Sequence, residues 1–206
     1  MSDIENKPTP FHIEPMEKGS LLHTGELTSL VAQPGDHLRD LTVKVRGLVS
    51  RGYLHPVGRD KNDARGALLF DPTAAVAAAA LLAASDAGLS GTEKFDRLAG
   101  ALQVWHGQTT EQGEPKNPAA FMLLTQIQSD VPHGFSVELH TSRSIVTGKP
   151  DYWAGVSHAD HGYLGSNVVL VQPNHVPVAA LVIPLDTHLS TIVANMEARD
   201  RKRAAN

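Results

Sequence analysis

Residues 37–56 read HLRDLTVKVRGLVSRGYLHP, and this stretch decides the fold expected for the N-terminal half. Its apolar residues recur at the spacing of one helical face, and Gly52 follows as a helix-ending residue. The apolar positions are Leu38, Leu41, Val45, Leu48 and Val49, and the basic residues lying mostly off that face are Arg39, Lys44, Arg46 and Arg51. We therefore expect an amphipathic helix over residues 37–51 with a basic outer surface.

The segments on either side of this helix predict a helix pair followed by a hairpin. Leucines recur over residues 21–32, where Thr24 is a suitable helix cap, and the breaker QPGD at 33–36 follows. The charged, glycine-bounded segment GRDKNDARG (58–66) lies between Tyr53-Leu54 and an apolar run at 67–70, which predicts a β-hairpin. Two further helices are expected over about residues 73–85 and 92–104.

This order of helix, turn, helix, charged hairpin and helix is typical of a winged helix-turn-helix. In such a module the second helix enters the major groove, and basic side chains neutralise phosphates. We expect an α+β fold with two domains joined by a linker. The predicted units are a flexible arm (1–19), a winged-helix DNA-binding domain (20–105), a linker (106–118) and an α+β dimerisation or effector domain (119–206).

The N-terminal half also resembles the MerR family of transcription regulators, over about residues 21–104. Gly25-Glu26-Leu27 resembles the family's opening helix, and VRGLVSRGYLHP (45–56) resembles its run of leucine, arginine, aromatics, glycine, two leucines and proline. Arg46, Gly52, Leu54 and Pro56 fall in register, whereas Gly47 and Leu48 replace the family's paired aromatics. Asp63-Ala64-Arg65 additionally resembles the wing of MarR-type regulators.

The resemblance implies a set of DNA-binding residues. Arg46 corresponds to a phosphate clamp, and Arg65 corresponds to the wing contact. The remaining candidates lie where a groove helix presents side chains (Arg39, Thr42 and Lys44) or where the hairpin would grip the backbone (Arg59 and Lys61). The alternative interpretation of each residue is an ordinary solvated surface group.

The charge distribution agrees with a basic face on an acidic body. The chain has 206 residues and a net charge of −4, yet residues 37–66 contain seven basic and three acidic side chains. A second basic segment, RDRKR at 199–203, lies near the end of the chain. Cysteine is absent, which excludes disulfides, thiolate zinc sites and cysteine nucleophiles.

The second half has a weaker pattern. We expect a helix over residues 119–128, a strand over 135–139 and a closing helix over 186–198. The glycine-rich stretch 141–166 is expected to be irregular, and apolar runs at 168–172 and 176–183 predict a hairpin.

Histidines and aromatics in the same stretch suggest alternative functions. His158 and His161, together with His133, His140 or His175, have side chains that could hold zinc, and Asp160 could orient a general-base histidine. Tyr152, Trp153 and Tyr163 gather there as well and could line a ligand pocket. A metal-dependent enzyme or ligand-binding protein centred on His158 and His161 is therefore one alternative, and a winged-helix protein-interaction module is another.

The sequence as a whole favours a non-enzymatic, sequence-specific regulator that binds double-stranded DNA as a homodimer without a cofactor. RNA polymerase and a small effector are further candidate partners. Because no apolar run approaches the ~20 residues needed to span a bilayer, we expect a cytoplasmic protein without membrane association.

Overall fold

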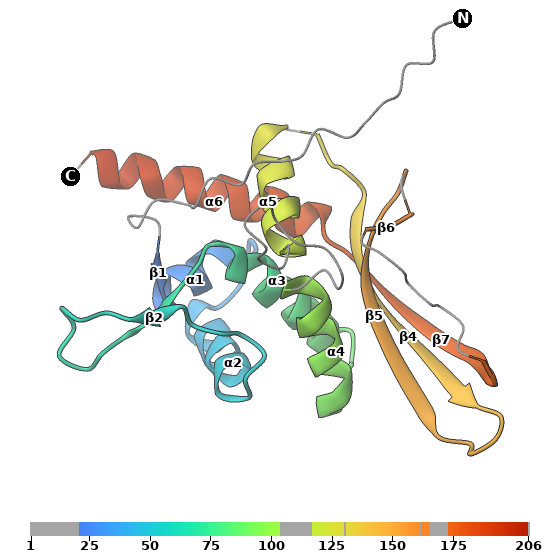
Figure 1. The fold of residues 1–206 in the computed structure, drawn as a ribbon. Helices are drawn as coiled ribbons and strands as arrows, with labels where there is room; N and C mark the ends of the chain where they lie inside the picture. The colour runs from blue at the N-terminus through green and yellow to red at the C-terminus, as the bar shows by residue number, and fades with distance from the viewer. Residues whose placement is uncertain (1–20, 104–116, 130, 161, 165–172, 206) are drawn as a thin grey trace, which may run out of the picture.

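The computed structural model describes residues 21–103, 117–129, 131–160, 162–164 and 173–205. Within these ranges the chain forms six helices and two antiparallel sheets, so the α+β fold class is confirmed. Figure 1 shows a helix pair with a hairpin at one end, a four-stranded sheet at the other and helices between them. None of the helices in the described part of the chain is both long and apolar enough to cross a membrane.

The N-terminal helices and hairpin follow the expected order, but a short strand that was not predicted, β1 (Leu22–His23), precedes them. The other elements are α1 (Thr24–Val31), α2 (Leu38–Ser50), β2 (Gly58–Arg59) and β3 (Leu68–Phe70). The three strands form a small antiparallel sheet in the order β1-β3-β2. The hairpin exists, but placing its first strand at Tyr53-Leu54 was wrong. Both side chains are buried, and Tyr53 stacks on Phe95 at 5.3 Å between ring centroids, so this segment packs into the core instead of pairing.

Three helices occupy the middle of the molecule: α3 (Thr73–Asp86), α4 (Thr92–Gln103) and α5 (Pro118–Gln128). The alanine-rich α3 is buried on most of its surface and contacts α1, α2, α4, α5 and α6. Small side chains let several neighbours approach one helix closely, and a helix that is apolar all round belongs in a core. Asn117 caps α5 by accepting a hydrogen bond from the backbone of Ala120 at 3.2 Å.

The second sheet contains β4 (Phe135–Ser144), β5 (Pro150–His158), β6 (Gly162–Leu164) and β7 (His175–Pro184), in the order β6-β5-β4-β7. The expectation that residues 141–166 are irregular was therefore wrong in the described part of this stretch, where the end of β4, β5 and β6 lie. The strand expected at 168–172, like the arm at 1–19, His161 and most of the linker, lies outside the described residues.

The four-stranded sheet has a buried face and an open face. On β4, Phe135, Val137 and Leu139 are buried, and Ser136 and Glu138 alternate with them on the opposite face. Helix α4 packs against this strand, and the Phe135 ring meets Phe121 of α5 edge-on. Within the described residues, helices cover one side of this sheet and not the other (Figure 1). The polar side chains of β4 therefore face outward.

The last helix, α6 (Asp186–Ala204), continues beyond the expected end at residue 198 and links the two ends of the molecule. At its start, the Asp186 carboxylate accepts hydrogen bonds from the backbone of Gly134 and Phe135, both at 3.1 Å. The helix then crosses the molecule and packs along α1 (Figure 1).

Candidate nucleic-acid interface

Helix α2 has one buried side and one exposed side. Leu41, Val45 and Leu48 are at most 8% exposed and fix its orientation against the core. Arg39 and Arg46 lie on the opposite side and are exposed. The structure thus places both arginines on a single outward face of the helix.

An apolar residue, Val43, lies on this same outward face and is 64% exposed. Its spacing from Arg39 and Arg46, four residues and three residues, puts all three side chains on one helical stripe. Val43 is not among the residues that the sequence predicted for DNA binding, because those are all basic or hydroxyl-bearing. The signal was present, since its position lies away from the helix's apolar face.

Thr42 and Lys44 both have partners within the chain. The Thr42 hydroxyl donates to the backbone oxygen of Leu38 at 2.7 Å. Lys44 Nζ lies 2.8 Å from a carboxylate oxygen of Asp86 at the end of α3, and this hydrogen bond raises the pKa of Lys44. Lys44 therefore joins α2 to α3, on a different side of α2 from Arg39 and Arg46.

The hairpin carries Arg59, Lys61 and Arg65, and all three are exposed. The Arg59 guanidinium donates to the backbone oxygen of Gly66 at 2.9 Å, which ties the two sides of the loop together. Gly66 has a φ of 61°, in the left-handed region that glycine adopts without strain.

Two aspartates shape the tip of the same hairpin. The Asp60 carboxylate accepts from the backbone of Asn62 at 2.8 Å, and that of Asp63 accepts from the backbone of Arg65 at 2.7 Å. Such aspartate turns hold a polar loop in one conformation. The hairpin therefore presents its basic residues from an ordered backbone, at the same end of the molecule as α2 (Figure 1).

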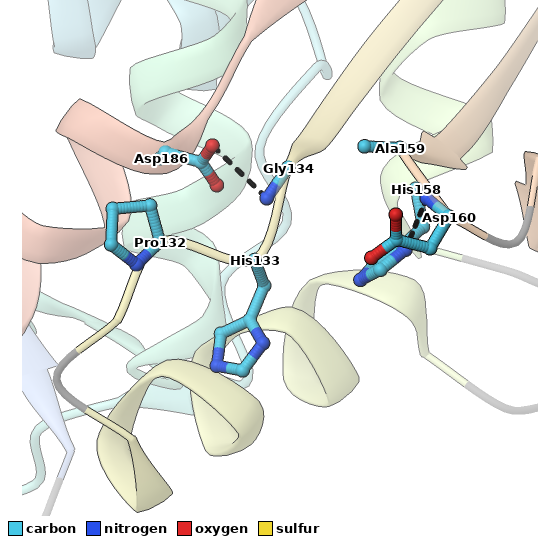
Figure 2. A pocket seen from close by; sticks show the side chains of 7 residues that line it. All are labelled: Pro132, His133, Gly134, His158, Ala159, Asp160 and Asp186. Atoms are coloured by element: carbon cyan, nitrogen blue, oxygen red, sulfur yellow. Dashed lines mark hydrogen bonds between the residues drawn. The ribbon is translucent and has the colours of Figure 1, made fainter.

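The histidine region forms a separate, open pocket of about 570 Å³ (Figure 2). It is lined by Pro132, His133, Gly134, His158, Ala159, Asp160 and Asp186. His158 Nδ1 accepts a hydrogen bond from the backbone of Asp160 at 3.1 Å. The Asp186 carboxylate accepts one from the backbone of Gly134, just before β4. Among the described residues, no three or more His, Cys, Asp or Glu side chains are grouped to hold a metal ion. His161 lies outside those residues.

The open face of the four-stranded sheet contains a polar cluster of Glu138, His140, Ser157 and Tyr163, which the sequence did not predict. Glu138 accepts hydrogen bonds from Ser157 at 2.7 Å and from the Tyr163 hydroxyl, and its other neighbour is His140 at 2.8 Å. Burial raises the pKa of Tyr163, and the adjacent Glu138 carboxylate raises it further. The indole ring of Trp153 packs directly over Gly155. A Cβ atom at position 155 would lie 2.3 Å from the ring, so this contact requires glycine. The alternation of polar and apolar residues on β4 was the available signal.

The side chains of this cluster form hydrogen bonds with one another. Burial alone would raise the pKa of Glu138, but hydrogen bonds from Tyr163, Ser157 and His140 outweigh it and hold the pKa below its ordinary value. The carboxylate is thus held ionised by its neighbours. The arrangement stabilises the pairing of β4, β5 and β6.

Comparison with protein-family models, with curated proteins and with solved structures finds no match to this chain.

Proposed function

We propose that this protein is a sequence-specific transcription regulator that binds double-stranded DNA as a homodimer through a winged helix-turn-helix within residues 20–105. The observation that carries the proposal is the outward face of α2, where Arg39, Val43 and Arg46 lie together and exposed. The succession β1-α1-α2-β2-β3, with a basic hairpin between the last two strands, supports it. In such modules the second helix lies in the major groove.

The chemistry of this face fits duplex DNA. Arginine recognises the O6 and N7 atoms of guanine, and an apolar side chain such as that of Val43 can contact the thymine methyl group. Arg46 and the hairpin residue Arg65 are assigned to phosphates. Lys44, bound to Asp86, is assigned to holding α2 in place rather than to the DNA.

The homodimer is proposed because a single α2 helix can contact only a short stretch of DNA. One helix of thirteen residues reaches a single half-site, and dimers of such modules bind two half-sites about one helical turn apart. Sedimentation of the DNA-bound chain measures this directly.

The test is the affinity for random-sequence duplex DNA across a series of salt concentrations. Binding of the full chain should fall steeply as salt rises, because each phosphate contact releases counterions. Arg46→Ala and Arg65→Ala should each make the negative slope of log affinity against log salt shallower by about 0.9. Lys149→Ala, at an exposed position in the turn between β4 and β5, serves as the matched control and should leave the slope unchanged.

Two results would contradict the proposal. Absence of binding at low salt would favour a protein-interaction module with the same fold. Equal effects of Lys149→Ala and Arg46→Ala would show that attraction to DNA is a property of overall charge and not of α2.

A further inference from the structure

The C-terminal end of α6 is a strongly basic surface that the proposed function does not use. Residues 199–203 read RDRKR and form the last turns of this helix. Arg201, Lys202 and Arg203 are exposed there. Basic residues near a helix C-terminus interact favourably with the helix dipole, which explains why they occur in the last turn. The dipole does not explain why this turn lies beside the hairpin.

A chain of polar contacts places this end of α6 beside the hairpin. The Arg203 guanidinium forms an ion pair with the Glu26 carboxylate in the first turn of α1. The other carboxylate oxygen of Glu26 accepts from the backbone of His23 at 2.9 Å, and His23 Nε2 lies 3.4 Å from the carboxylate of Asp60. Asp60 lies directly between Arg59 and Lys61 in the sequence. The basic end of α6 and the basic hairpin therefore flank β1 and the start of α1 (Figure 1).

The position of this helix end is fixed relative to α1. The Asn195 side-chain amide donates to backbone oxygens near the end of α1, including that of Leu30 at 3.0 Å. One turn earlier, the Thr191 hydroxyl donates to the Gln33 side chain at 3.2 Å. Because α6 is bound at both ends of α1, its basic turn has a defined place beside the helix pair.

Three acidic side chains of this surface have partners, and Glu197, one turn before Arg201 on α6, is exposed. Glu26 is paired with Arg203, Asp60 lies against His23, and Asp200 lies 3.0 Å from the Arg199 guanidinium. Arg201 and Lys202 are exposed at the same end of α6 as Arg203 and add two positive charges beside the hairpin. A polyanion that lies along the hairpin would meet them.

We infer that the C-terminal turn of α6 is a second backbone-binding element, in which Arg201 and Lys202 contact phosphates of the same DNA duplex that the hairpin grips. This inference rests on the proposed function and adds a binding element from the other end of the sequence. The hairpin and the end of α6 would then hold the duplex at two places while α2 reads the groove.

The test compares the full chain with the double variant Arg201→Gln/Lys202→Gln on random-sequence duplex DNA. Arg203 is left in place because it holds Glu26. The control, Arg97→Gln/Lys149→Gln, removes the same charge from exposed positions on α4 and in the β4–β5 turn. Two lost phosphate contacts should make the negative salt slope shallower by about 1.8, and the difference in affinity should shrink as salt rises. The control should keep the wild-type slope.

The outcomes separate this inference from the proposed function. A wild-type chain that binds DNA and is weakened by Arg46→Ala, but keeps its slope in Arg201→Gln/Lys202→Gln, overturns the second element alone. An equal loss in the control variant overturns it as well, because the effect would then follow net charge. A wild-type chain with no affinity for duplex DNA overturns both.

Discussion

Glu138 shows at the scale of one residue how the open face of the sheet is held together. Its side chain is 15% exposed and accepts hydrogen bonds from Ser157 and Tyr163. Hydrogen bonds to a charged group contribute about 1.5–3 kcal/mol each, so Glu138→Gln should lower the free energy of unfolding at neutral pH by about 1–3 kcal/mol. Urea denaturation followed by circular dichroism measures this loss.

The same residue gives a pH dependence with a definite sign. Because the pKa of Glu138 is lower in the folded chain than in the unfolded chain, its contribution is present above the unfolded pKa and is lost as pH falls through the folded pKa. Wild type and Glu138→Gln should therefore converge in stability as the solution is acidified below about pH 4.5, near the pKa of a free glutamate. The exposed Glu197→Gln variant should follow wild type throughout. A constant difference between wild type and Glu138→Gln at all pH values would contradict this role.

At the scale of elements, sequence periodicity predicted the helices well because their apolar spacing is local. Helix α2 was recognisable from Leu41, Val45 and Leu48, which are indeed its buried residues. Strand β5 was missed because glycine and small residues at 154–157 conceal its alternation. The register of β5 is set by its pairing with β4 and β6. The sequence of β5 alone carries no information about that pairing.

The candidate sites were predictable to different degrees for the same reason. Exposed basic residues on α2 and in the hairpin follow from helical spacing and turn composition alone. The pairing of Lys44 with Asp86 spans 42 positions, and the contact of Tyr163 with Glu138 spans 25. Both depend on how elements pack, so composition and spacing could not supply them.

The contact between α6 and α1 is testable at this scale. Helix α1 ends at Val31 and the next residue, Ala32, is extended. The Asn195 amide donates to the backbone oxygens of Ser29, Leu30 and Ala32 at this end. The last backbone carbonyl groups of a helix have no hydrogen-bond partner within the helix, so they need partners from outside it. Asn195→Ala should lower the free energy of unfolding by about 1–2 kcal/mol, and Asn195→Asp by more, since a carboxylate would face the same oxygens.

Urea denaturation measures both Asn195 variants, with Ser190→Ala at an exposed position of α6 as the control. An Asn195→Ala protein that unfolds at the wild-type denaturant concentration would show that the helix end is satisfied without α6.

At the scale of the whole molecule, the buried side chains form one continuous core. Leu189 and Ile192 of α6 are fully buried, and they belong to the same cluster as Leu27 of α1 and Val137 of β4. The central α3 contacts elements of both halves, including α1, α5 and α6. The sequence predicted separate units at 20–105 and 119–206, but a shared core leads us to expect that both unfold in one transition.

Leu189→Ala tests this expectation because it removes buried volume where the halves meet. Such substitutions cost about 2–5 kcal/mol, and a single cooperative unit distributes that loss over every element. Amide hydrogen exchange should therefore show equal loss of protection in the cores of α2 and β4, although neither contains the substitution. Val178→Ala, at a position 57% exposed on β7, should change neither element. Loss of protection confined to β4 would mean that the four-stranded sheet unfolds independently. Residues 20–105 would then be the unit that carries the DNA-binding face, and the basic end of α6 would reach the hairpin from a separate domain.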